Sequence, residues 1–255
     1  MIGIVKTSDK RFLYMSTYFK EGVIYSDKAL DFKDIDTLIL PIGGVDRFLF
    51  VKDSTINLNE ILNNSNVKTI IAGKINEDLK NICQNDDIKL LSYLDDPFYA
   101  WENAKLTSYV LLKKILNDFD DSIINLNILI LGSGYCARAI YHMLKNINNN
   151  LSIYCKDRHD IKELYCKGIE YEDLNNLSKY DIIINTVDFN LIKGSMFSDL
   201  KYQVKLYDIA SYPYGFSLDD ASNYHFKVEI LPKLPSLVPR EAGQVLYLTI
   251  KKMIW

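Results

Sequence analysis

The sequence predicts an α/β protein with two domains, and three observations lead to this prediction. The chain has 255 residues, which is long for one core and short for three. Short apolar runs alternate with polar, helical-looking stretches, a pattern typical of parallel sheets covered on both faces. The same alternation starts again near Asn127, after a long helical segment. We therefore expect two parallel sheets joined by a helix.

The first domain is predicted to occupy residues 1–101. Its expected strands are short apolar runs followed by polar or turn residues, namely Ile2–Val5, Asp36–Pro41, Val67–Gly73 and Ile88–Leu91. Strands of this kind, separated by helical stretches, favour a flavodoxin-like or Rossmann-like sheet.

A linking segment, residues 102–122, is predicted to follow. Its helix runs from Glu102 to Leu116, because apolar residues recur there at helical spacing and the stretch contains neither Gly nor Pro. The polar residues 117–122 then end the pattern. We place the domain junction across this helix.

The second domain is predicted to occupy residues 123–238. Its expected strands are Asn127–Leu131, Leu151–Cys155, Asp181–Asn185, Val204–Asp208 and Lys227–Leu231. The final segment, 239–255, is expected to be a helix that packs back on the first domain. Its apolar stripe consists of Ala242, Val245, Leu246, Thr249, Ile250 and Met253.

A glycine-rich turn follows the first strand of the second domain and opens a helix. It has the pattern G-x-G-x-x-A, with the residues Gly132, Ser133, Gly134, Tyr135, Cys136 and Ala137. The first Gly permits the tight turn, the second lets a pyrophosphate approach the backbone, and the small third residue lets helix and strand pack closely. This context predicts a doubly wound NAD(P)-binding Rossmann domain. The alternative is a turn with only a structural role.

The residues about 20 positions further on bear on the choice of cofactor. Lys156 and Arg158 flank Asp157 there. Cations at this point suit a 2′-phosphate, so the pattern favours NADP, whereas Asp157 suits a ribose hydroxyl and leaves NAD open. Alternatively, both cations are solvated loop charges.

Two further strand ends are expected to line the same crevice, because ligands of open parallel sheets bind beyond the carboxyl ends of the strands. Asn185 and Thr186 are candidates to contact the nicotinamide-side ribose, and Ser211 and Tyr212 to face the nicotinamide. As strand-end turn residues, Asn185 and Thr186 equally suit a purely structural role.

Composition excludes several classes of protein. A net charge of −3 gives no global basic field for nucleic acid or anionic membrane, and no apolar run approaches the ~18–20 residues of a membrane span. Scattered cysteines and a start without the layout of a signal peptide suggest the cytoplasm. The three histidines show no metal-ligand spacing, so we expect no metal.

Four stretches together resemble the dipicolinate synthase A family of spore-forming bacteria. One is Asp9-Lys10-Arg11, like that family's Gly-Asp-x-Arg, and another is the glycine turn. The others are Asp208-Ile-Ala-Ser-Tyr-Pro213 and Leu234–Gln244, the latter similar to the family's Leu-Pro-Gly-x-Val-Ala-Pro-x-x-Ala-Gly-Gln. Their order and spacing cover nearly the whole chain.

The resemblance implies a two-domain fold like that of the formate/glycerate dehydrogenases, with the cofactor in the cleft. It implies oxidation of dihydrodipicolinate to dipicolinate with NADP, beside a flavoprotein-like second subunit of dipicolinate synthase, in the cytoplasm of the mother cell during sporulation. A homo-oligomer is compatible with the sequence.

The chain departs from the family on the linking helix. The family carries Asn-Ala-x-Pro-Thr-x-Glu-Gly, and here Asn103, Ala104 and Thr107 remain while Tyr109 replaces the Glu. Ser236 replaces a Gly of the last motif. These losses keep two alternatives open: a weakened or differently specific relative, and a non-enzymatic nucleotide-binding protein.

A dicarboxylate substrate needs separated cationic or donor sites. Arg11 and Arg240, from two of the resembling motifs, are expected to approach one another across the interdomain cleft, near Ser211 and Gln244. The alternative for the arginines is a surface ion pair. We identify no general base.

Overall fold

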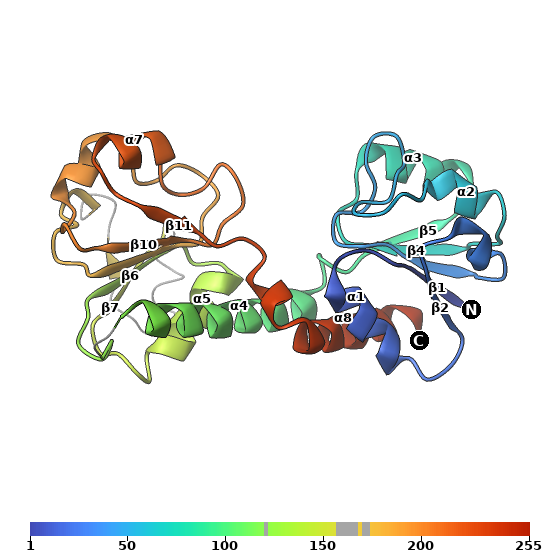
Figure 1. Cartoon of the computed structure of the whole chain (residues 1–255), viewed down its shortest axis with the longest axis horizontal. Helices are drawn as coiled ribbons and strands as arrows, with labels where there is room; N and C mark the ends of the chain where they lie inside the picture. Colours follow the sequence, from blue (N-terminus) through green and yellow to red (C-terminus); the bar gives the residue numbers. More distant parts are fainter. Residues whose placement is uncertain (120–121, 157–167, 170–173) are drawn as a thin grey trace. The chain divides into compact units, whose positions relative to one another are not determined.

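A computed structural model of the chain describes residues 1–119, 122–156, 168–169 and 174–255. The described residues form two compact units, each built on a parallel sheet (Figure 1). Unit 1 comprises Met1–Asn103 and Val238–Trp255, and unit 2 comprises Ala104–Leu237. The predicted two-domain α/β fold class is confirmed.

Unit 1 contains a parallel sheet with the strand order β2-β1-β3-β4-β5, the flavodoxin-like order. Its strands are β1 (Ile2–Val5), β2 (Val23–Ser26), β3 (Thr37–Ile39), β4 (Thr69–Ala72) and β5 (Lys89–Ser92). Its helical segments are α1 (Lys10–Tyr18), η1 (Ala29–Phe32), α2 (Leu58–Leu62), α3 (Glu77–Asn85) and α8 (Pro239–Ile254).

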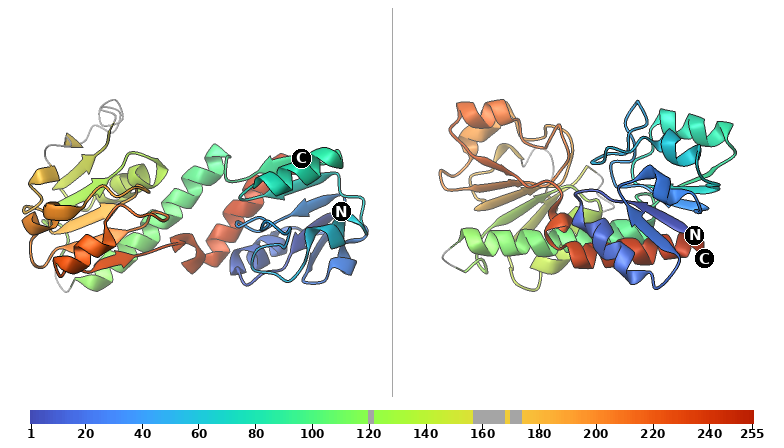
Figure 2. Two further views of the ribbon diagram at one scale, coloured as in Figure 1. Left: turned by 90° about the horizontal axis from the view of Figure 1, so that it is seen from above. Right: turned by 45° about the vertical axis from the view of Figure 1, so that its right-hand side comes forward.

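Alternate strand residues of unit 1 face two separate cores, as the period of two in a strand requires. Ile39 and Ile71 pack with residues of α1 and α8. Leu38 and Ile70 pack on the other face, with residues of η1, α2 and α3. Figure 2 shows α1, in blue, beside α8, in red, although they come from opposite ends of the chain.

The contact between α1 and α8 depends on a glycine of the last helix. A Cβ at Gly243 would lie 2.7 Å from the Arg11 carbonyl oxygen and 2.9 Å from the Met15 nitrogen. Only a residue without a side chain lets the two backbones approach this closely. The C-terminal helix therefore belongs to the fold of unit 1.

Helix α4 (Pro97–Asp118) contains the boundary between the units. It begins earlier than the sequence pattern predicted, because Asp96 accepts a hydrogen bond from the Tyr99 nitrogen at 3.0 Å and Pro97 takes the first helical position.

Unit 2 contains a parallel sheet with the strand order β11-β10-β9-β6-β7-β8, which is the Rossmann order. Its strands are β6 (Ile128–Leu131), β7 (Leu151–Tyr154), β8 (Gly168–Ile169), β9 (Ile182–Asn185), β10 (Lys205–Asp208) and β11 (Val228–Ile230). Its described helical segments, besides most of α4, are α5 (Tyr135–Leu144), η3 (Gly194–Asp199), α7 (Leu218–Asn223) and η4 (Leu234–Leu237).

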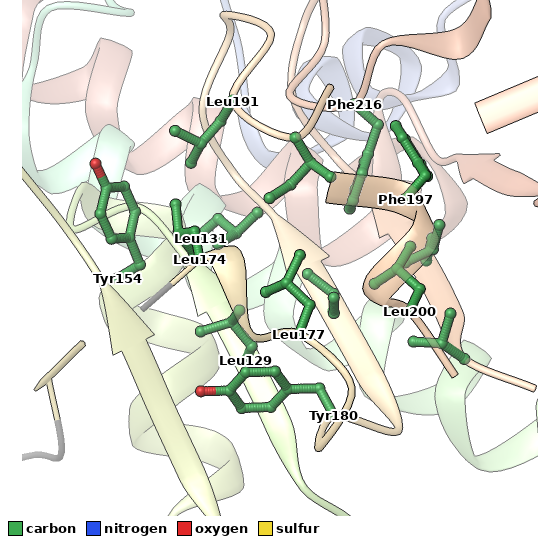
Figure 3. Packing of buried hydrophobic residues seen from close by; sticks show 14 of the residues in the cluster. Leu129, Leu131, Tyr154, Leu174, Leu177, Tyr180, Leu191, Phe197, Leu200 and Phe216 are labelled. Carbon is green, nitrogen blue, oxygen red and sulfur yellow. The ribbon is translucent and has the colours of Figure 1, made fainter. Parts of the chain in front are cut away.

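One face of this sheet is covered by the segments that follow β9 and β10. Leu129 and Leu131 point into a cluster with Leu191, Phe197 and Phe216 (Figure 3). On the other face, the Tyr207 hydroxyl donates a 2.6 Å hydrogen bond to Asp118 of α4. The sheet of unit 2 is thus packed on both faces, as its continuous apolar strands predicted.

Candidate functional site

The site is the carboxyl edge of the unit 2 sheet, which we define as the residues that follow β6, β9 and β10. In the strand register Leu131 lies opposite Asn185, and Asn185 lies opposite Asp208. The loops after these three strands therefore begin side by side. The chain order reverses between β6 and β9, so this edge contains the switch point at which doubly wound sheets bind ligands.

Gly132 makes the turn after β6 and has a structural reason to be glycine. Its φ of +116° is rare for residues with a side chain, and a Cβ there would lie 2.3 Å from the Thr186 hydroxyl oxygen. Its N–H donates to the Tyr154 carbonyl at 2.8 Å. The turn is thereby locked between β7 and the loop after β9.

Unlike Gly132, Gly134 is not required to be glycine by its backbone conformation or by its packing. It caps α5 with φ −69° and ψ −175°, values open to any residue, and it makes no side-chain capping hydrogen bond. A Cβ there would meet no atom within 4 Å among the described residues. Among the described residues, the space beside the start of α5 is therefore open, as a bound phosphate requires.

The other residues of the turn hold this helix start in place. Ala137 is fully buried, which agrees with the need for a small residue at the third motif position. The Arg138 side chain donates from Nε to the Ser133 carbonyl at 2.8 Å. The thiol of Cys136 is hydrogen-bonded to Thr107 of α4, and burial raises its pKa. Tyr135 is half exposed beside them.

Of the three residues expected to select the cofactor, the structure describes one. Lys156 is exposed, two positions after the last residue of β7. Asp157 and Arg158 lie outside the described residues. The choice between NADP and NAD stays a prediction that the geometry does not test.

Asn185 is fully buried, and its side chain is committed to the protein itself. Its Nδ2 donates to the Val187 carbonyl at 2.8 Å and to Asp208 Oδ1 at 2.9 Å, and its Oδ1 accepts from the Val187 nitrogen at 3.1 Å. These hydrogen bonds agree with the structural role that the sequence left open for Asn185, and a contact with a cofactor ribose stays an untested prediction. Thr186 is half-buried and donates to the Leu131 carbonyl at 2.8 Å.

Asp208 organises the third loop of the carboxyl edge. It is fully buried and accepts hydrogen bonds from the backbone nitrogens of Ala210 at 3.0 Å and Gly215 at 2.8 Å. Burial raises its pKa, although these hydrogen bonds act in the opposite direction. Ser211 and Tyr212 are exposed on the loop that it holds.

Arg11 lies in unit 1 and is paired within its own motif. Asp9 caps α1, accepting from the Arg11 nitrogen at 3.0 Å, and its carboxylate binds the Arg11 side chain at 2.9 Å from Nε and 2.6 Å from Nη2. The side chain of Arg11 is only 7% exposed. Burial opposes its charge, but the bonds to Asp9 outweigh this and raise the pKa of Arg11. The ion-pair alternative thus agrees with the structure, although the pair is buried and not on the surface, and the role as a substrate fork stays an untested prediction.

Arg240 and Gln244 are exposed one turn apart on α8. The Arg240 guanidinium lies 5.7 Å from the centre of the Tyr14 ring on α1. Arg11 and Arg240 both belong to unit 1, so the expectation that they face one another across the interdomain cleft is wrong. The predicted return of residues 239–255 to the first domain already implied this placement, since it puts Arg240 in the same unit as Arg11.

Two site features were missed from the sequence. The contact of Thr107 with Cys136 was signalled by Thr107 surviving in the divergent helix motif. The network around Asp208 and Asn185 was signalled by two polar residues that each end a buried strand, where side chains turn towards backbone rather than solvent.

The site contains no metal cluster among the described residues. In the part of the chain that the structure describes, three or more His, Cys, Asp or Glu side chains nowhere gather in a way that suits a metal ion. Among the same residues, every helix is too short or too polar to cross a membrane.

Comparison with known proteins gives one curated relative and several similar structures. No family model matches the chain. The dipicolinate synthase A protein of Bacillus subtilis (strain 168) is 22% identical over 236 residues, which cover 88% of this chain and 80% of the relative.

The crystal structure of dipicolinate synthase A from Bacillus subtilis matches with a TM-score of 0.84 at 20% identity, over 99% of this chain and 95% of that one. The D-lactate dehydrogenase of Salmonella matches with a TM-score of 0.71 at 10% identity, over 99% and 95%. The fold is thus that of the two-domain dehydrogenases, and the chain is a divergent relative of dipicolinate synthase A, as its four sequence stretches indicated.

Proposed function

We propose that this chain is an NADP-dependent oxidoreductase that oxidises dihydrodipicolinate to dipicolinate. The observation that supports it most is Gly134: a glycine that its own fold does not need, placed where a pyrophosphate would meet the helix start. The similarity to dipicolinate synthase A supports the choice of substrate.

The proposed reaction asks little acid–base chemistry of the protein. The substrate is a partly reduced ring with two carboxylates, and loss of a hydride and a proton makes the ring aromatic. A nicotinamide cofactor, when bound, would supply the hydride acceptor, and solvent would take the proton. The protein then acts mainly by orienting the dianion and excluding competing geometries.

The substrate contacts in this proposal come from exposed donors. Arg240 and Gln244 on α8 are assigned to a carboxylate, because a guanidinium matches carboxylate geometry and the amide lies one turn away. Ser211, in unit 2, is assigned to the nicotinamide side of the carboxyl edge. Arg11 is left out because Asp9 already occupies it.

We also propose a partner protein and a cellular location for this chain. By its similarity to dipicolinate synthase A, the chain would work beside a flavoprotein-like second subunit, in the cytoplasm of a sporulating mother cell. Isolation of the chain from its native cell with such a flavoprotein bound would support this part.

A second candidate is a differently specific relative with the same cofactor site. It is favoured by Tyr109, which stands where the related family has a Glu and is 55% exposed. Such a relative would bind NADP but leave dihydrodipicolinate unchanged.

Turnover with freshly prepared dihydrodipicolinate separates these candidates. The wild-type chain, assayed with and without the flavoprotein-like partner, should form NADPH and dipicolinate in equal amounts. Arg240→Ala should lower kcat/KM by about 30- to 1000-fold, because one substrate carboxylate loses its cation. Lys20→Ala, which removes another exposed cation of unit 1, is the matched control and should leave turnover unchanged. Cofactor binding without turnover would favour the second candidate.

The preference for NADP is tested separately, by calorimetry with NADPH and NADH. One charge-assisted contact to the 2′-phosphate is worth about 1.5–3 kcal/mol, so we expect NADPH to bind at least about tenfold more tightly. Lys156→Ala combined with Arg158→Ala should remove the preference and leave the affinity for NADH unchanged. Equal affinities in the wild type would overturn the choice of NADP.

A further inference from the structure

A buried carboxylate and a buried amide join two loops of the carboxyl edge. Asp208 Oδ1 accepts from Asn185 Nδ2 at 2.9 Å and from the Ala210 nitrogen at 3.0 Å, while Oδ2 accepts from the Gly215 nitrogen at 2.8 Å. The same Asn185 amide bonds the backbone of Val187 in both directions. One network therefore fixes the loops after β9 and β10 to each other.

The closeness of this packing explains a third residue. A Cβ at Gly215 would lie 2.1 Å from the Asn185 side chain. The Gly215 carbonyl in turn accepts from the nitrogens of Leu191 and Ile192, at 2.8 and 3.0 Å. The far end of the loop 209–215 is therefore as firmly held as its start at Asp208, while Ser211 and Tyr212 between them are exposed.

The loop 209–215 lies on the β9 side of the glycine turn, opposite the β7 side. β7, which leads to Lys156, pairs with one edge of β6, and β9 and then β10 follow on its other edge. A dinucleotide with its pyrophosphate at Gly134 would have its adenosine on the β7 side, so its nicotinamide end would extend towards β9 and β10.

From this geometry we infer that Asp208 and Asn185 form a positioning clamp, which shapes the loop 209–215 for the nicotinamide end of the cofactor. The inference rests on the proposed function. Neither side chain touches the ligand, because both are fully buried, so they act through the loop backbone. Asp208→Asn would replace one acceptor by an NH₂ group facing an N–H donor of the loop or of Asn185, which leaves a buried donor unpaired.

The test compares a whole and a truncated cofactor. Calorimetry measures NADPH and 2′-phospho-ADP-ribose, which has the adenosine and pyrophosphate but lacks nicotinamide, on the wild type and on Asp208→Asn. We expect the variant to bind NADPH at least about tenfold more weakly and the truncated ligand within about twofold of the wild type. Asp220→Asn is the matched control, since Asp220 also accepts a backbone hydrogen bond in unit 2, from Gly194 at 2.8 Å. It should change neither affinity.

The possible outcomes separate the two proposals. If the wild type binds neither ligand, the proposed function fails, and the clamp fails with it. If the wild type binds both and Asp208→Asn weakens both equally or neither, only the clamp is overturned. Should Asp208→Asn not fold, Asn185→Ser must show the same selective loss. If neither variant folds, the pair is a folding determinant and the inference is wrong.

Discussion

At the scale of single residues, glycines that look equivalent in the motif have different functions. Gly132 is required by the backbone and by the 2.3 Å approach of Thr186, whereas Gly134 stands in open space. The sequence predicted both glycines from the spacing of the motif. The motif also predicted this division, with the tight turn at Gly132 and the approach of a pyrophosphate at Gly134. It did not predict the contact with Thr186, because the position of the neighbouring loop depends on the folded unit.

Replacing each glycine by alanine should separate these functions in stability. Gly132→Ala should lower the free energy of unfolding of unit 2 by about 2–4 kcal/mol, because it combines backbone strain with overpacking. Gly134→Ala should change it by less than about 1 kcal/mol. Urea denaturation, monitored by hydrogen exchange of the unit 2 amides, measures both changes in the free energy of unfolding. Equal losses of stability in the two variants would contradict the different functions of the two glycines.

Replacing the two arginines should likewise have unequal effects on the stability of unit 1. Arg11→Met should destabilise unit 1 by about 2–4 kcal/mol, because the carboxylate of Asp9 would remain largely buried without its partner. Arg240→Ala should cost less than about 1 kcal/mol, the value of an exposed cation–π contact. Urea denaturation of unit 1 is the measurement. A large loss of stability in Arg240→Ala, without one in Arg11→Met, would contradict this expectation.

At the scale of elements, the sequence predicted the central strands and one edge strand of each sheet, and missed the other edge strand. β2 and β8 were absent from the prediction, since β2 is a short, half-buried edge strand and β8 has two residues. An edge strand needs neither a continuous nor an alternating apolar pattern, so periodicity does not reveal it. The start of α4 was readable from Asp96-Pro97, a capping residue followed by proline.

The amino ends of β6 and β9 are joined by a carboxylate whose contribution should depend on pH. Asp181 accepts from the Asn127 nitrogen at 2.8 Å and pairs with Lys201 at 2.5 Å. Burial opposes its ionisation, but the bonds from Lys201 and Asn127 outweigh this and hold the pKa of Asp181 below its ordinary value. The unfolded chain therefore binds a proton to Asp181 at a higher pH than the folded chain does.

The lowered pKa of Asp181 determines how its contribution to stability should change with pH. Asp181→Asn should lower the free energy of unfolding of unit 2 by about 1–2 kcal/mol at neutral pH. The difference from the wild type should shrink below about pH 4, as protonation removes the contribution of Asp181. Asp199→Asn, at an exposed carboxylate of the same unit, is the control. A difference that grows as the pH falls would contradict the assignment.

At the scale of the whole molecule, two parallel sheets were predictable because the apolar pattern restarts near Asn127. The return of α8 to unit 1 follows from its apolar stripe, with Leu246 and Ile250 buried among residues of α1 and β1. The substrate residues were harder to predict. Motif resemblance pointed to Arg11 without revealing that its neighbour Asp9 neutralises it.

The central claim is that the carboxyl edge of unit 2 binds a nicotinamide dinucleotide through the open space at Gly134. Titration of NADPH into the wild-type chain and into Gly134→Val, followed by nicotinamide fluorescence, tests it most directly. Circular dichroism and thermal unfolding should match in the two proteins, because the fold leaves room for the side chain. Gly22→Asn, at a unit 1 glycine that also stands in open space, is the control and should bind as the wild type does. We expect saturable binding by the wild type and at least about tenfold weaker binding by Gly134→Val. Wild-type affinity in a folded Gly134→Val would contradict it.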